Sequence, residues 1–167
     1  RLSHEGEPMF YAQSFVPDLL YRYGAVLVGG FTSFSGGFWN IDEDGRFTPV
    51  PRLRELNVSL RDRSDALKFL AGAYVNHVPV YRCQGPKIGE YLNRVSDWKC
   101  DGVVIHQDIG CRSQMAGVME AAAALKRAGV PVVMYESSNG DPRDFTPEQV
   151  EERIEAFLER LGHDRIS

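Results

Sequence analysis

Residues 101–135 decide the fold of this 167-residue chain, because they contain two buried strands with a helix between them. Residues 101–105 read Asp-Gly-Val-Val-Ile, and residues 130–135 read Val-Pro-Val-Val-Met-Tyr. Such short apolar runs are typical of parallel strands that are buried on both faces. Between them, apolar residues from Met115 to Leu125 recur at helical spacing, and Ala128-Gly129 predicts the end of that helix. A strand, a helix and a strand form a right-handed βαβ unit.

The rest of the chain follows the same alternation. We expect further strands at residues 1–4 and 25–28, and helices at about 10–23, 64–77 and 87–98. Thr146-Pro147-Glu148-Gln149 predicts the start of a last helix, with an N-cap threonine, a proline in the first turn and a capping-box glutamine. Residues 31–62 are polar and contain glycine, so they hold either a functional loop or short helices.

These elements predict a single α/β domain over residues 1–167, with a doubly wound, mainly parallel sheet of about four strands and helices on both faces. This is a flavodoxin-like or Rossmann-like architecture. The chain begins with Arg1 inside an expected strand, which suggests a piece of a longer polypeptide.

The composition indicates a globular protein outside membranes, since 43% of the residues are hydrophobic, 25% are charged and no apolar run is long enough to span a bilayer. A net charge of −4 without a basic, aromatic stripe argues against nucleic-acid binding. The three cysteines form no Cys-x-x-Cys pair. Their odd number and spacing favour a reducing compartment, and we expect a cytoplasmic protein.

Cys111 is the sharpest chemical feature of the sequence. Ligands of parallel sheets collect beyond the carboxyl ends of strands, and Cys111 follows such a strand, two residues before a plausible N-cap, Ser113. A helix N-terminus and Arg112 both stabilise a thiolate, so the position suits a metal ligand. The alternative is an incidental cysteine at a strand end. Cys100 reads as an apolar filler, and Cys83 stays open.

Three neighbouring features have both a structural and a functional interpretation. His106 is expected to be a hydrogen-bonded structural residue, with a metal-ligand or acid–base role as the alternative. Residues 139–145 read Asn-Gly-Asp-Pro-Arg-Asp-Phe and predict a turn, in which Arg143 pairs with Asp141 or Asp144. The aromatic and hydroxyl residues of 31–39 predict either a pocket for a flat or acyl ligand or a local cluster that anchors a loop.

Several of these stretches together resemble the C-terminal domain of the 2-hydroxyacyl-CoA dehydratase and benzoyl-CoA reductase family, including the 2-hydroxyglutaryl-CoA dehydratase D-component. The resemblance rests on residues 100–106, Gly110-Cys111-Arg112, residues 125–132, the turn at 139–145 and the closing helix at 149–161. It covers most of the chain in order.

The resemblance implies a two-lobed subunit that pairs with a second, homologous subunit. It implies a 4Fe–4S cluster held by three cysteines, of which Cys111 matches the one from the C-terminal lobe. It also implies an acyl-CoA or aryl-CoA thioester substrate and an ATP-hydrolysing iron–sulfur activator that donates a low-potential electron. The candidate substrate-binding residues are Phe31, Thr32, Ser33, Gln107, Arg112 and Asn139.

The family has two branches, and the pattern around Cys111 favours one of them. Arg112 after Cys111, followed by the turn at 139–143, is closer to the benzoyl-CoA reductase side, because the Cys-Asp-Pro more frequent in dehydratases is absent. Two other interpretations stay open: a metal-free, flavodoxin-like binding module, and a non-catalytic scaffold subunit of the same family.

Overall fold

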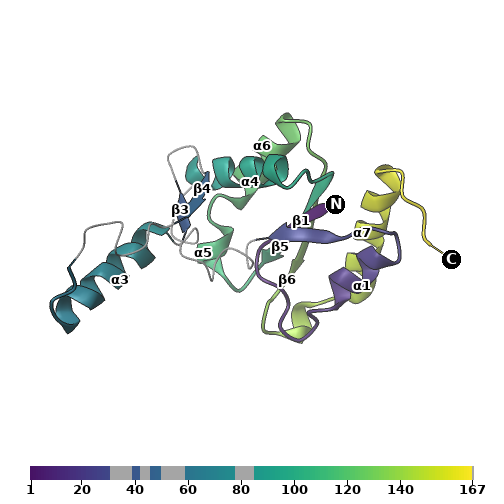
Figure 1. The fold of residues 1–167 in the computed structure, drawn as a ribbon. Coiled ribbons are helices and arrows are strands. Elements are labelled where there is room, and N and C mark those ends of the chain that lie inside the picture. Colours follow the sequence, from purple (N-terminus) through teal and green to yellow (C-terminus); the bar gives the residue numbers. More distant parts are fainter. Residues whose placement is uncertain (31–38, 42–45, 50–58, 78–84, 167) are drawn as a thin grey trace.

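A computed structural model describes residues 1–30, 39–41, 46–49, 59–77 and 85–166. Its central sheet contains four parallel strands in the order β2–β1–β5–β6 (Figure 1). The prediction of a parallel sheet of about four strands is therefore confirmed. The strands are β1 (Leu2–Glu5), β2 (Leu27–Gly30), β5 (Gly102–Asp108) and β6 (Val132–Ser137).

The two C-terminal strands reach further than their apolar runs. β5 and β6 are paired from Val103 and Val132 as far as Asp108 and Ser137. The expected strands ended at Ile105 and Tyr135, because the residues beyond them are polar. Among these polar residues, His106 and Ser137 hydrogen-bond each other across β5 and β6, and Asp108 accepts N–H groups just beyond the strands, which the sequence alone does not reveal.

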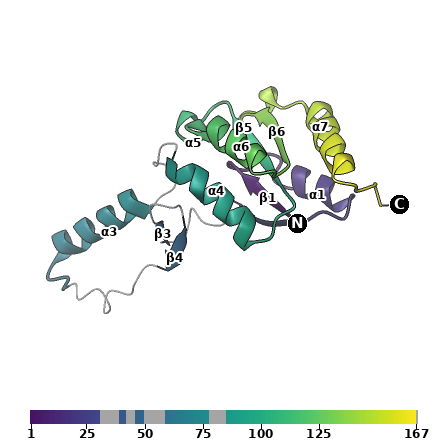
Figure 2. The ribbon, with the colours of Figure 1, turned by 90° about the horizontal axis from the view of Figure 1, so that it is seen from above.

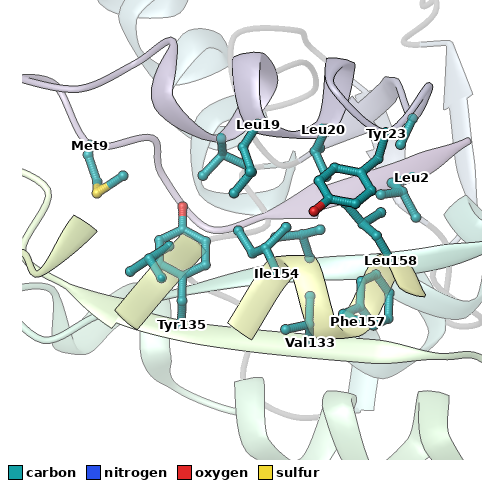
Figure 3. Packing of buried hydrophobic residues seen from close by; sticks show 14 residues of the cluster. Leu2, Met9, Leu19, Leu20, Tyr23, Val133, Tyr135, Ile154, Phe157 and Leu158 are labelled. Atoms are coloured by element: carbon teal, nitrogen blue, oxygen red, sulfur yellow. The ribbon is translucent and has the colours of Figure 1, made fainter. Parts of the chain in front are cut away.

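One face of the sheet is covered by α1 (Phe15–Tyr21) and α7 (Pro147–Arg160). Figure 3 shows their buried side chains meeting over the sheet: Leu19 and Leu20 from α1, Ile154 and Leu158 from α7, and Tyr135 from β6. The helix α1 is shorter than the predicted 10–23, because the residues before it form turns closed by Ala12 N–H to Met9 O and Phe15 N–H to Ala12 O.

The opposite face is covered by α4 (Gly85–Asp97) and α6 (Val118–Arg127), so the predicted double winding is confirmed (Figures 1 and 2). The expectation of one continuous helix from Met115 is wrong. A short helix, α5 (Arg112–Met115), precedes α6, and Gly117 separates them with a left-handed φ of 76°. Glycine adopts that conformation without the clash that a side chain would bring.

The last helix begins at Pro147 as predicted, but the predicted capping box does not form. The Thr146 side chain makes no capping hydrogen bond. The Thr146 carbonyl accepts the Val150 N–H at 3.2 Å. Because Pro147 has no N–H, this end of the helix has one donor fewer to satisfy.

A smaller unit lies to one side of the sheet (Figures 1 and 2). It contains the antiparallel hairpin β3 (Trp39–Ile41) and β4 (Phe47–Pro49), together with the helix α3 (Arg63–His77). The helix predicted at 64–77 is thus confirmed, although Leu67 and Leu70 on it are exposed. Among the described helices, none is both long and apolar enough to traverse a bilayer.

Candidate functional site

The chain changes winding direction between β1 and β5. The helix that follows β1 packs on one face of the sheet, whereas α6, which follows β5, packs on the other. In doubly wound sheets, ligands bind beyond the carboxyl ends of the strands at such a switch point. The segments that leave the sheet there begin at Gly6 after β1 and at Ile109 after β5.

Asp108 fixes the turn that leads from β5 to Cys111. Its side chain is fully buried, and Oδ1 accepts the N–H groups of Gly110 at 2.9 Å and Asn139 at 3.3 Å. Its carbonyl also accepts the Cys111 N–H at 3.3 Å. Its second oxygen, Oδ2, has no hydrogen-bond partner among the described residues. Asp108 therefore ties the Cys111 turn to the end of β6.

Gly110 keeps this turn narrow. A Cβ built on Gly110 would lie 3.3 Å from Asp108 Oδ1 and 3.5 Å from Ser138 Oγ. The first of these distances is tighter than most Cβ contacts, so a side chain would push the turn away from Asp108. Because Gly110 has no side chain, the turn can lie close enough to Asp108 for the hydrogen bond between them.

Cys111 is partly buried and is itself the N-cap residue of α5. The prediction that Ser113 caps this helix is therefore wrong, and the helix starts one residue after the cysteine. Because α5 has only four residues, its dipole supports a thiolate less than the long helix predicted from the sequence would. Arg112 is exposed next to it.

His106 has a structural role, as the sequence analysis favoured, but it lies inside β5 rather than at its end. Its Nδ1–H donates to the Glu7 carbonyl, and its Nε2 lies 2.8 Å from the Ser137 hydroxyl oxygen. The ring also stacks on Tyr135, with 4.9 Å between ring centroids. Both nitrogens are thus engaged, one with the segment that follows β1 and the other with β6.

Two of the candidate substrate-binding residues lie at the Cys111 turn: Arg112, which follows the cysteine, and Asn139. Asn139 contacts Asp108 through its backbone, and its side-chain amide donates to Glu7 Oε2 at 3.2 Å. Gln107 points to the opposite face of the sheet from its neighbour Asp108, because side chains alternate along a strand. The remaining candidates, Phe31, Thr32 and Ser33, lie outside the described residues, as does Cys83.

The turn predicted at 139–145 contains the expected ion pair. Arg143 Nε donates to both oxygens of Asp141, at 2.9 and 3.1 Å. These hydrogen bonds lower the pKa of the Asp141 carboxyl. Since Arg143 is exposed and already paired, the structure favours turn formation over anion binding for this residue.

Sequence reasoning missed a buried ionic network between β1 and α4. Arg94 pairs with both Glu5 and Glu90, and all three side chains are almost fully buried. Burial raises the pKa of Glu90. Lys87, one turn earlier, donates to the Ala116 carbonyl at 2.7 Å, at the end of α5. The signal was present in the spacing of 87, 90 and 94, which places three charged residues on one helix face.

Sequence reasoning also missed a cavity on the α1 side of the sheet. It has a volume of about 230 Å³ and lies between the start of α1, β1 and β2. His4 and Tyr135 line it, and His4 Nε2 lies 3.0 Å from the Tyr135 hydroxyl. Burial and the nearby His106 lower the pKa of His4 to about 4. Cys111 does not line this cavity.

Comparison with known proteins identifies the family. The model of the family described as 2-hydroxyglutaryl-CoA dehydratase, D-component, matches residues 1–161. The lactoyl-CoA dehydratase subunit alpha of Anaerotignum propionicum is 28% identical over 115 residues, which cover 68% of this chain and 26% of that relative. The chain thus matches about a quarter of the relative's length. Because the family match extends over nearly all of its residues, the chain belongs to the 2-hydroxyglutaryl-CoA dehydratase D-component family.

Proposed function

We propose that this chain is one lobe of a subunit of an iron–sulfur 2-hydroxyacyl-CoA dehydratase, and that Cys111 supplies one thiolate to a 4Fe–4S cluster. The family description and the name of the relative both refer to CoA dehydratases. The pattern around Cys111 favours a benzoyl-CoA-type reductase instead. We give the dehydratase priority because two independent comparisons support it, and we keep the reductase as the second candidate.

The observation that carries the proposal is the placement of Cys111. It is partly buried at the carboxyl edge of the sheet, directly after the strand that borders the switch point. Within the part of the chain that the structure describes, no three His, Cys, Asp or Glu side chains are arranged to hold a metal ion. The proposal therefore requires the other cluster ligands to come from elsewhere in the enzyme.

The residues around Cys111 hold it in a fixed position, as a cluster ligand requires. Asp108 holds the start of the turn and Lys87 holds the end of α5, so the thiol is fixed from both sides. When bound, the cluster would supply low-potential electron transfer to the thioester substrate. The chain's own part is to present the Cys111 thiolate on a rigid turn.

The proposal includes partners beyond this chain. It requires an acyl-CoA substrate, a second homologous subunit and an ATP-hydrolysing iron–sulfur activator as electron donor. It also places the enzyme in the cytoplasm, where cysteines stay reduced. None of these partners needs to contact the described residues directly for the Cys111 test to work.

The test is the iron content of the full-length protein purified anaerobically with its partner subunit. We expect Cys111→Ser to lose most of the iron of this subunit and to abolish the activity, because serine is a poor ligand for iron–sulfur clusters. Cys100→Ser is the matched control, since Cys100 packs partly buried among apolar residues. Unchanged iron in Cys111→Ser, or a complex that is colourless and iron-free before mutation, contradicts the proposal.

Activity assays separate the two branches. The complex is supplied with activator, ATP and reductant, and then with either a 2-hydroxyacyl-CoA or benzoyl-CoA. Loss of the hydroxyl from the first substrate alone supports the dehydratase. Reduction of the benzoyl ring assigns the reductase branch. Iron without either reaction contradicts the proposed activity.

A further inference from the structure

Two glycines at the end of β2, Gly29 and Gly30, line the cavity on that side. Gly30 pairs with His4 in the register between β2 and β1, and Gly29 precedes it. A Cβ on Gly30 would lie 2.1 Å from the His4 carbonyl oxygen, so no other residue fits there without moving the strand. With no side chain at either position, space remains between the sheet and the start of α1.

The lining of this cavity carries no charge. The described residues around it are apolar or glycine, apart from His4, Gln13 and Tyr135. The His4 ring is neutral at about pH 7, because its pKa is lowered to about 4. Burial raises the pKa of Tyr135, so its hydroxyl stays protonated. A charged ligand would find no ionic partner among these described residues, which favours an uncharged ligand over a charged one.

The cavity nevertheless offers hydrogen bonds. Nε2 of His4 is committed to the Tyr135 hydroxyl, and its Nδ1 makes no hydrogen bond to any described residue. A neutral imidazole has one donor and one acceptor nitrogen. Gln13, which also lines the cavity and is otherwise exposed, adds an amide that can donate and accept. The polar groups thus match a ligand with one or two uncharged hydrogen-bonding atoms.

The volume limits the size of the ligand. An engineered cavity of about 150 Å³ accommodates benzene, which has six non-hydrogen atoms. By proportion, about 230 Å³ accommodates roughly nine non-hydrogen atoms. We propose that the His4–Tyr135 cavity binds an uncharged carbonyl or amide group of about this size. Two sources could supply it: the pantetheine arm of a CoA thioester, if the proposed function holds, or a separate small molecule.

Benzamide and benzoate test this chemistry, because they have the same shape and differ in charge. Their binding to the full-length protein is measured by calorimetry at about pH 7. We expect benzamide to bind at least about tenfold more tightly than benzoate, since only benzoate brings an unpaired charge. Leu27→Trp fills the cavity and should abolish benzamide binding. The same change at the exposed Leu67 on α3 should have no effect.

A second variant keeps the test decisive if Leu27→Trp does not fold. His4→Phe preserves a ring but removes both nitrogens, so benzamide affinity should fall at least about fivefold while toluene binding is kept. No measurable benzamide binding, equal affinity for benzamide and benzoate, or unaltered benzamide binding in a folded variant overturns the proposal. Pantetheine that competes with benzamide identifies the CoA arm, and lack of competition identifies a separate ligand. None of these readouts depends on iron or dehydratase activity.

Discussion

At the scale of single residues, Asp108 connects the Cys111 turn to β6. Asp108→Ala would leave the N–H groups of Gly110 and Asn139 without this buried acceptor. We expect this variant to lower the free energy of unfolding by about 1–3 kcal/mol. Asp108→Asn keeps one acceptor oxygen for these N–H groups. It replaces only Oδ2, which lacks a partner among the described residues. It should therefore be clearly more stable than the alanine variant, as urea titration measures. Equal losses in both would contradict this role.

The sequence predicted which edge of the sheet carries Cys111, but not what holds it there. The strand before Cys111 is visible as an apolar run, and its carboxyl end follows from the parallel fold. The partners of Asp108 and His4 are 31 and 131 residues away in the sequence. Such contacts depend on strand register and order, which local patterns do not encode.

At the scale of elements, the break between α5 and α6 gives a matched pair of glycine substitutions. Gly117→Ala should destabilise the protein by about 1–2 kcal/mol, because alanine is strained at a left-handed φ. Gly72→Ala, in α3 and with no atom within 4 Å of its new Cβ, should stabilise by about 0.5–1 kcal/mol. Thermal unfolding of both variants measures this. If Gly117→Ala raised the stability as Gly72→Ala does, the left-handed conformation of Gly117 would not be the reason for the break.

The sequence predicted most elements from periodicity, and its errors have identifiable causes. The apolar spacing from Met115 to Val118 continues across Gly117, so the break is invisible to a pattern of side chains. The predicted helix at 10–23 began too early for a similar reason, because turns can carry apolar residues at helical spacing. The hairpin of β3 and β4 was not predicted, since its strands have only three residues each.

At the scale of the whole molecule, His4 makes folding stability depend on pH. Its folded-state pKa of about 4 lies below the ordinary value of 6.5. The unfolded chain therefore binds the proton first, and stability present above about pH 6.5 is lost as the pH falls towards 4. Since the ring is only partly buried, we expect a loss of about 2 kcal/mol, less than the full shift would give.

Denaturant titrations at several pH values measure this dependence. His4→Gln should flatten the curve between about pH 6.5 and 4. His163→Gln, which alters an exposed histidine, should leave the curve unchanged. Glu90, whose pKa is raised, contributes in the opposite direction, but it is present in both variants and cancels in their comparison. A steep acid loss that persists in His4→Gln would assign the effect to another group.

The alternation of side chains along β1 has a consequence for how the sheet assembles. Leu2 and His4 face the uncharged layer under α1, whereas Ser3 and Glu5 face Arg94 on the other side. Sliding this strand by one position would bury a carboxylate among apolar side chains and remove one of the two carboxylates that pair with Arg94. A shifted register is therefore disfavoured on both faces of the sheet at once. The side-chain pattern of β1 thus helps to specify its register with both neighbouring strands.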